Sequence, residues 1–206
     1  MDYGSDLIND AHLVAEVAHS AVGQLRKYTN DPYIVHPRAV LKLLVENVLD
    51  VSEEMACAAL LHDVLEDTKL TKRFLVTRFG YTVANLVEEL TEVEHRIKQP
   101  SEGGPQRRVG PVKNRKAQKI MEARRLAKVS SEAKTIKLAD LCDNVYSIIA
   151  HDPNFSKVFL DEANYLLENS LWGSTSHRLF DMAEDFVKTG YMTLGKPAPF
   201  LARDAD

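Results

Sequence analysis

Several features that mark particular protein classes are scarce or missing in this chain of 206 residues. Two cysteines, Cys57 and Cys142, are too few for a disulfide framework, and both lie in apolar stretches where we expect them to act as small core residues. No apolar run approaches the roughly 18 residues that a membrane span needs, and the N-terminus lacks the basic and apolar regions of a signal peptide. We therefore expect a cytoplasmic location and no membrane partner.

The chain also lacks a convincing strand pattern and an internal repeat. Apolar residues make up 45% of it and charged residues 27%, which suits a soluble globular protein and excludes wholesale disorder. Its length suits one domain with one core. We expect an all-α single domain over residues 1–190, followed by a C-terminal tail over residues 191–206.

Apolar periodicity predicts a succession of helices along the chain. Polar residues and prolines mark an extended turn over 28–37, with Pro37 placed to begin a helix. Ser52 is expected to open a central helix, Thr71 to begin another, and Gly80 to end that one. The expected helices cover about 6–26, 37–48, 52–67, 71–79, 83–93, 117–129, 131–151, 155–168 and 176–187.

The most informative stretch is 55–68, MACAALLHDVLEDT, where an uncharged run ends in one imidazole and three carboxylates. At 3.6 residues per turn, these four side chains fall within roughly 140° of one helix face. They are His62, Asp63, Glu66 and Asp67. Carboxylates in a buried, low-dielectric place repel one another unless a cation lies among them. We therefore predict a divalent metal here, and the uncharged run argues against the alternative of a solvated acidic turn.

A second helix, expected over 131–151, carries one polar stripe through an apolar surface. Its polar residues fall within roughly 80° of one another. They are Lys137, Asp140, Asn144 and Ser147. Asp140 with Asn144 could alternatively be a buried hydrogen-bonded pair without further role.

Positive charge gathers in residues 96–119, which hold eight basic residues against one acid, Glu102. Three glycines and three prolines lie among them, in a chain whose net charge is −4. This asymmetry predicts a mobile basic loop that could meet an anionic ligand. A solvated loop without a role is the alternative that the sequence leaves open.

Three separated segments each offer metal-type ligands, in the order His36, His62-Asp63 and Asp140. We expect His36 just before a helix start. The order resembles the signature of the HD superfamily of metal-dependent phosphohydrolases, in which two imidazoles and two carboxylates hold one divalent ion. The resemblance implies an HD-type helical bundle with these four residues as ligands. Mixed nitrogen and oxygen ligation suits Mn²⁺, Fe²⁺ or Zn²⁺, and the hard carboxylates favour Mn²⁺.

Further motifs are similar to those of the RelA/SpoT-type alarmone hydrolases and cover most of residues 18–150. They are GQLRK at 23–27, PYIVHP at 32–37, AALLHDVLEDT at 58–68, FG at 79–80 and KLAD…N at 137–144. This resemblance implies a stand-alone, Mn²⁺-dependent hydrolase that removes pyrophosphate from the 3′ position of (p)ppGpp and leaves GDP or GTP. The expected partner is thus a small nucleotide and not a nucleic acid, and a homo-oligomer is left open.

The same resemblance gives roles to individual residues. Glu66 and Asp67 would orient and deprotonate the attacking water. The residues expected to contact the nucleotide are Arg26 at the base, Lys27 and Lys137 near phosphates or as braces of the site, and Asn144 with Ser147 at the ribose. Arg26 and Lys27 could instead be a cationic helix C-terminus, which the helix dipole favours.

The chain departs from the family pattern at a few positions. Leu141 stands where the family often has Arg or Lys, Asp143 replaces the usual His or Tyr, and Thr91-Glu92 replaces Thr-Lys. We expect these changes to touch substrate contacts and not metal ligands. The nucleotide therefore stays open: (p)ppApp or the 2′-phosphate of NADPH would present a ribose-borne phosphate to the same site. The rival class is a non-catalytic nucleotide sensor.

The remaining histidines lack partners in these motifs. They are His12, His19, His95, His151 and His177. We expect them at the surface.

Overall fold

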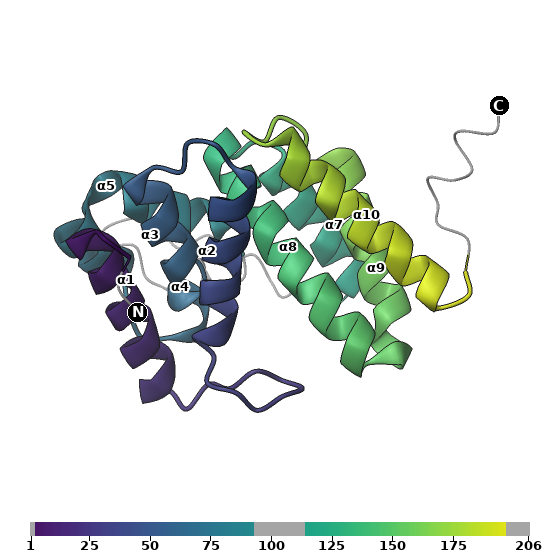
Figure 1. Cartoon of the computed structure of the whole chain (residues 1–206), viewed down its shortest axis with the longest axis horizontal. Helices are drawn as coiled ribbons and strands as arrows, with labels where there is room; N and C mark the ends of the chain where they lie inside the picture. Colours follow the sequence, from purple (N-terminus) through teal and green to yellow (C-terminus); the bar gives the residue numbers. More distant parts are fainter. Residues whose placement is uncertain (1–2, 93–113, 197–206) are drawn as a thin grey trace.

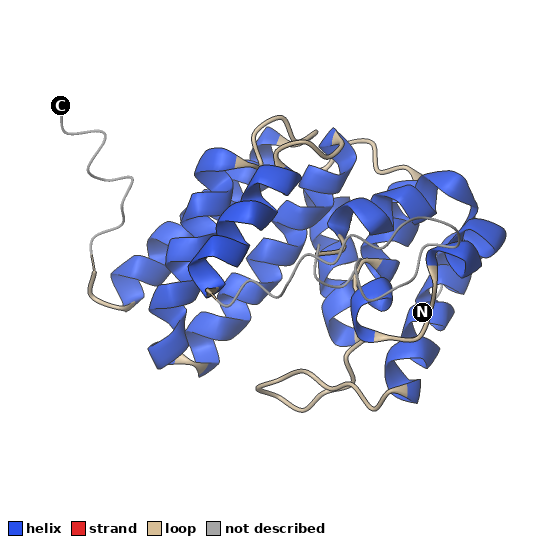
Figure 2. Cartoon of the chain, turned by 180° about the vertical axis from the view of Figure 1, so that it is seen from behind, coloured by secondary structure: helices blue, strands red, loops and turns tan. Residues whose placement is uncertain are grey.

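The computed structural model describes residues 3–92 and 114–196, and the regular structure within these ranges is helical apart from one isolated bridge between Leu25 and Pro32. The predicted all-α class is confirmed (Figures 1 and 2). The helices are α1 (Asp6–Ala21), α2 (Val35–Asn47), α3 (Glu53–Leu61), α4 (Val64–Asp67), α5 (Lys72–Leu90), α7 (Arg115–Leu126), α8 (Ser131–His151), α9 (Pro153–Asn169) and α10 (His177–Thr193).

The helices form two groups that lie side by side in Figure 1. The N-terminal group consists of α1 to α5, and α3 lies among α1, α2 and α5 with Met55–Leu61 buried throughout. The C-terminal group consists of α7 to α10, where α8 packs against α9 and α10. Because α8 also packs against α2, α3 and α5, it joins the two groups.

Side-chain caps define several helix starts. Ser52, Thr71 and Ser130 each accept a hydrogen bond from the backbone N–H three residues further on. A cap of this kind stabilises a helix by roughly 1 kcal/mol. The starts predicted at these positions are confirmed.

The connection between the first two helices differs from the prediction. α1 ends at Ala21, short of residue 26, and Gly23 adopts a φ of 68°, a left-handed conformation that glycine reaches without a steric penalty. Residues 22–34, here called the connecting loop, follow. The second helix begins at Val35, so that His36, expected just before a helix, lies in its first turn.

The central helix is interrupted at the predicted metal ligands. α3 ends at Leu61, and α4 begins at Val64 after Asp63 has taken a φ of −97° and a ψ of −5°. The prediction of one continuous helix to Asp67 was wrong. Helical periodicity alone could not reveal the break, because Leu61, Val64 and Leu65 keep helical spacing across it.

Two further helix boundaries bear on the predicted organisation. Gly80, with a φ of 85°, bends α5 where a break was predicted, although helix continues on both sides. α10 continues to Thr193, and buried Tyr191 on it donates a hydrogen bond to Asp161, so the predicted tail starts inside a helix. The division into a domain over 1–190 and a tail stays a prediction.

Most of the predicted basic loop lies outside the described residues, in the range 93–113. Its last part is described and belongs to the ordered fold. Arg115 and Lys119 lie on α7 and pair with Glu162 at 2.6 Å and with Glu92 at 2.9 Å. The prediction of a mobile loop reaching residue 119 was therefore wrong for this end of it.

The helices are too short or too polar to cross a membrane, as far as the described part of the chain goes.

Candidate metal centre

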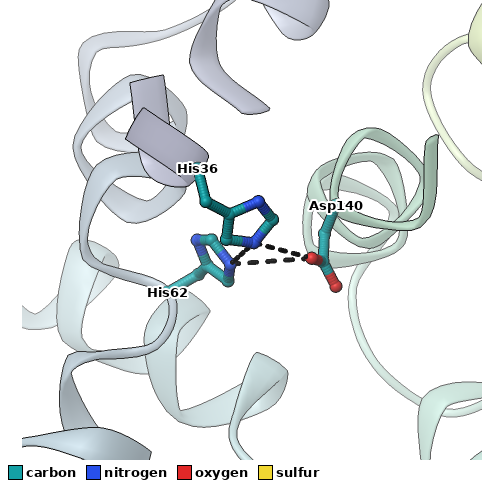
Figure 3. A group of neighbouring side chains, drawn as sticks. All are labelled: His36, His62 and Asp140. Atoms are coloured by element: carbon teal, nitrogen blue, oxygen red, sulfur yellow. Dashed lines mark hydrogen bonds and ion pairs between the residues drawn. The ribbon is translucent and has the colours of Figure 1, made fainter. Parts of the chain in front are cut away.

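Three side chains from separate segments of the chain converge where the two groups of helices meet. His36 on α2, His62 directly after α3 and Asp140 on α8 each offer one ligand atom within 4.8 Å of the others, and all three are buried. Figure 3 shows both imidazole rings and the carboxylate pointing toward one another. The two Nε2 atoms lie 3.3 Å apart, and that of His36 lies 3.1 Å from Asp140 Oδ1.

Asp63, the fourth predicted ligand, borders the same space. Its Oδ2 lies 3.0 Å from Nε2 of His62 and 3.7 Å from Nε2 of His36. The same oxygen accepts a hydrogen bond from the hydroxyl of Tyr33, which fixes its direction. Tyr33 belongs to the motif PYIVHP, but no role was predicted for it.

Both imidazoles turn the same nitrogen toward the centre. Nδ1 of His62 lies 2.8 Å from the carbonyl of Ala59, and Nδ1 of His36 lies 2.7 Å from Oδ2 of Asp143. Carbonyl and carboxylate oxygens only accept hydrogen bonds, so each Nδ1 carries a hydrogen and each neutral ring presents the lone pair of Nε2.

The convergent atoms fit a bound cation. Two nitrogen lone pairs and carboxylate oxygens face one another at 3.0 to 3.8 Å. Atoms bound to one ion at about 2.1 Å stand about 3.0 to 3.5 Å apart. Acceptors at these distances repel one another unless a metal ion or protons lie among them.

The pKa shifts of the metal-free site point the same way. Burial opposes a charge on His62, but Asp63 and Asp140 outweigh it and raise the pKa of His62 to about 9. Burial likewise opposes a charge on Asp140, yet Lys137 and His36 hold the pKa of its carboxyl well below the usual range. The centre therefore favours positive charge, which a divalent ion can supply in exchange for protons.

Two residues of the polar stripe on α8 brace Asp140. Lys137 Nζ and Asn144 Nδ2 each donate to one of its carboxylate oxygens at 2.6 Å. Ser147 lies further along α8, where its carbonyl accepts a hydrogen bond from His151. Lys137 thus contacts the predicted ligand Asp140, and its predicted role near phosphates or as a brace stays a prediction, as do the ribose contacts of Asn144 and Ser147.

The two predicted catalytic carboxylates lie in different surroundings. Glu66 accepts a hydrogen bond from the backbone N–H of Glu92 at 2.5 Å. Burial, and after it the charge of Asp63, raises the pKa of Glu66 to about 7, so this group can take or release a proton near neutrality. Asp67 is exposed.

A short hydrogen-bonded chain that was not predicted orients Asp67. Gln24 in the connecting loop donates to its Oδ2 at 2.7 Å, and Oε1 of Gln24 lies 2.6 Å from Nδ1 of His19. The ring of His19 packs against Tyr33 with 4.6 Å between ring centroids. The motif GQLRK held the signal for Gln24, since it contains this residue together with Arg26 and Lys27.

The histidines expected at the surface divide into two kinds. His151 and His177 are exposed, as predicted. His12 and His19 are buried, so the prediction was wrong for them. Both lie on the side of α1 that packs into the N-terminal group. The pattern of apolar residues in this helix did not predict that these two histidines would be buried. His95 lies outside the described residues.

The two predicted cationic contacts of the connecting loop face different surroundings. Arg26 Nη2 lies 2.9 Å from Oδ2 of Asp143 on α8. Lys27 is exposed, with Nζ 3.5 Å from Asp152. Because α1 ends at Ala21, the alternative that these residues form a cationic helix terminus was wrong.

The positions that depart from the family pattern do not all lie in substrate contacts. Asp143 touches the predicted ligand His36, so the expectation that the departures avoid metal ligands was wrong for it. Leu141 is a buried core residue, and Glu92 donates its backbone N–H to Glu66.

A cavity of about 70 Å³ opens beside Asp140. Lys137 and Asn144 line it together with further charged residues such as Lys119 and with apolar ones such as Phe159 and Leu166. A larger hollow of about 460 Å³ lies between α1 and the start of α5, but its lining is mostly apolar and holds none of the predicted site residues. Of the predicted site residues, Lys137, Asp140 and Asn144 line the smaller cavity.

Comparison with known proteins places these features in a family. The family profile described as HD domain matches residues 11–160. A Vibrio cholerae protein named guanosine-3′,5′-bis(diphosphate) 3′-pyrophosphohydrolase is 42% identical over 89 residues, and Escherichia coli K12 SpoT, named a bifunctional (p)ppGpp synthase/hydrolase, is 45% identical over 87 residues. These alignments cover 43% and 42% of this chain and only 12% of each relative.

Solved structures extend the similarity to nearly the whole chain. A metazoan SpoT ortholog, described as hydrolysing ppGpp, matches with a TM-score of 0.73 and 26% identity, over 92% of this chain and 98% of that one. The Listeria monocytogenes protein lmo0812 shares the fold, with a TM-score of 0.61 and 24% identity over 81% of this chain and 99% of that one. The similarity to SpoT-type hydrolases indicated by the motifs is confirmed.

Proposed function

This chain belongs to the HD domain family, and we propose that it is a metal-dependent hydrolase that removes the 3′-pyrophosphate of a (p)ppGpp-type alarmone. The observation that carries the proposal is the convergence of His36, His62 and Asp140, with Asp63 beside them. The carboxyl of Glu66, whose pKa is raised to about 7, lies on the same short stretch as His62 and Asp63. The Vibrio cholerae relative is named for this reaction and the metazoan structure is described as hydrolysing ppGpp, and together they support the substrate class.

The four predicted ligands would hold one divalent ion through two imidazole nitrogens and two carboxylates. They are His36, His62, Asp63 and Asp140. We propose Mn²⁺, because mixed nitrogen and carboxylate ligation with open positions suits it. When bound, the ion supplies Lewis-acid stabilisation of charge on a phosphate oxygen and makes water more acidic.

Side chains of the protein then accept the proton and order the attacking water. Glu66 accepts a proton from the attacking water, which its raised pKa permits near neutral pH. Asp67, oriented by Gln24, orders that water from the exposed side. The water oxygen forms a bond to phosphorus, the bond from phosphorus to the ribose 3′ oxygen breaks, and this oxygen leaves with a proton. Pyrophosphate and GDP or GTP result.

Groups around the centre would bind the rest of the nucleotide. Arg26 would contact the base, Lys27 would attract phosphates from its exposed position, and Asn144 with Ser147 would contact the ribose. Lys137 would brace Asp140 and lend positive charge near a phosphate. The cavity beside Asp140 supports this placement, because Lys137 and Asn144 line it.

A nucleotide panel tests the proposal. The purified protein is incubated with Mn²⁺ and separately with ppGpp, pppGpp, ppApp or NADPH, and released pyrophosphate or phosphate is measured. We expect pyrophosphate from ppGpp and pppGpp, none without metal, and little with Glu66→Gln. Asp185→Asn, at an exposed position of α10, is the matched control with full activity.

Other outcomes would redirect the proposal. Turnover of ppApp alone would change the base, and phosphate released from NADPH alone would change the substrate class. Tight binding of ppGpp without turnover under any divalent metal would favour the nucleotide sensor. A cytoplasmic location and a possible homo-oligomeric state stay predictions.

A further inference from the structure

We propose that Asp143 is a positioning residue for the metal centre, whose carboxylate holds the ring of His36 in the orientation that presents Nε2 and holds Arg26 at the same time. The part that concerns nucleotide binding rests on the proposed function, whereas the part that concerns metal affinity does not.

One oxygen atom makes both contacts. Oδ2 of Asp143 lies 2.7 Å from Nδ1 of His36 and 2.9 Å from Nη2 of Arg26. The side chains of Arg26 and Asp143 are only 16% and 21% exposed, and that of His36 is 1% exposed. Shielding from water makes such a charged contact stronger than a pair on the open surface.

The contact fixes His36 chemically as well as sterically. A carboxylate can only accept, so Nδ1 must donate and Nε2 keeps its lone pair for the metal. A carboxylate partner also makes the imidazole a better electron donor. His62 reaches the same state through the carbonyl of Ala59, a backbone group that no side-chain substitution removes. His36 is thus the imidazole whose orientation depends on a side chain from the other group of helices.

Arg26 adds a link between metal and nucleotide. It lies in the connecting loop, while Asp143 lies on α8, so their contact ties the loop to the C-terminal group. Loss of Asp143 should therefore change both the affinity for metal and the KM for nucleotide. Loss of Arg26 leaves the contact between Asp143 and His36 in place and should change only KM.

Metal titration without nucleotide tests the first part. Asp143→Leu removes the acceptor, and we expect its Kd for Mn²⁺ to rise about 10- to 100-fold, the usual effect of losing such an outer partner. Asp143→Asn keeps the shape and one acceptor oxygen but loses the charge, so a smaller rise is expected. Asp185→Asn, the same chemical change at an exposed position, should leave Kd unchanged. Circular dichroism verifies that each variant is folded.

The result that overturns this part is a Kd for folded Asp143→Leu equal to that of the Asp185→Asn control. If Asp143→Leu fails to fold, Asp143→Ala removes the same acceptor without adding bulk, and an unchanged Kd in that variant overturns this part equally. A Kd weakened equally in Arg26→Ala would also overturn it, since Arg26 and not Asp143 would then order the ring.

A double-mutant cycle in KM tests the link to Arg26. If Asp143 acts on the nucleotide through Arg26, the double variant Arg26→Ala/Asp143→Asn should raise KM no further than the larger single effect. A rise in KM of the double variant that equals the product of the two single rises would overturn the link. If the wild type hydrolyses none of the panel nucleotides, the proposed function fails, while the Mn²⁺ titrations still decide whether Asp143 positions His36.

Discussion

The two groups of helices meet at the candidate metal centre but hold their predicted site residues in different ways. The N-terminal group contributes His62, Asp63, Glu66 and Asp67 from one short stretch, and His62 is fixed by the carbonyl of Ala59 three residues away. The C-terminal group contributes a single predicted ligand, Asp140. Each of its two carboxylate oxygens accepts a hydrogen bond from a neighbour on the same helix. The first group thus supplies most of the chemistry, and the second sets how charge is distributed around it.

The strongest test of this comparison is His62→Ala. Removing one of the four proposed ligands should abolish measurable hydrolysis and weaken metal binding by more than the roughly 100-fold that outer partners reach. Metal analysis after gel filtration checks it. A full equivalent of Mn²⁺ retained by the variant would remove His62 from the ligand set.

Glu66→Gln should separate proton transfer from metal binding within the N-terminal group. The variant keeps the shape of the side chain but cannot accept a proton from water, so kcat should fall about 10²- to 10⁴-fold while the metal stays bound. Steady-state kinetics together with metal analysis check both parts. Near-normal turnover would assign the proton to Asp67 or to no side-chain base.

The raised pKa of Glu66 has a consequence for stability without metal. Because the folded-state pKa is about 7, above an ordinary value of 4.5, the folded protein favours the protonated form. This contribution is fully present below pH 4.5 and is lost as the pH rises through 7. By linkage the loss approaches about 3 kcal/mol, with local relaxation making it smaller.

Glu66→Gln should therefore stabilise the metal-free protein at pH 8 and have little effect at pH 4.5. Denaturant unfolding of both proteins at the two pH values, with chelator present, measures the difference. An equal effect at both values would mean that packing, and not charge, distinguishes the two side chains.

We expect the smallest effects from substitutions of two polar residues on α8, Asn144 and Ser147. Asn144→Ala removes a hydrogen bond to Asp140 and should weaken Mn²⁺ binding about 10-fold. Ser147→Ala should leave the metal affinity unchanged and, if the serine meets the ribose, raise KM a few-fold, as expected for one lost neutral hydrogen bond. Calorimetry and kinetics on both variants check this. Equal losses of metal affinity would show that the polar stripe acts as one unit.

Much of the fold could be predicted because it depends on near neighbours in the chain. The serines and threonine at the helix starts act on backbone groups three residues away, and the apolar periodicity that identified the helices spans only a few turns. The same holds for the order His36, His62-Asp63 and Asp140, since each ligand sits in a recognisable local motif.

The sequence by itself thus determined an all-α fold, the family and the three side chains, His36, His62 and Asp140, that meet at the candidate metal centre. Only the tertiary structure decided that the central helix breaks at His62, that His19 is buried, and that Asp143 holds His36 from 107 positions away. The reason is physical. Periodicity reports which face of a helix is apolar, but it carries no information on which distant polar group will share a hydrogen bond once the faces have packed.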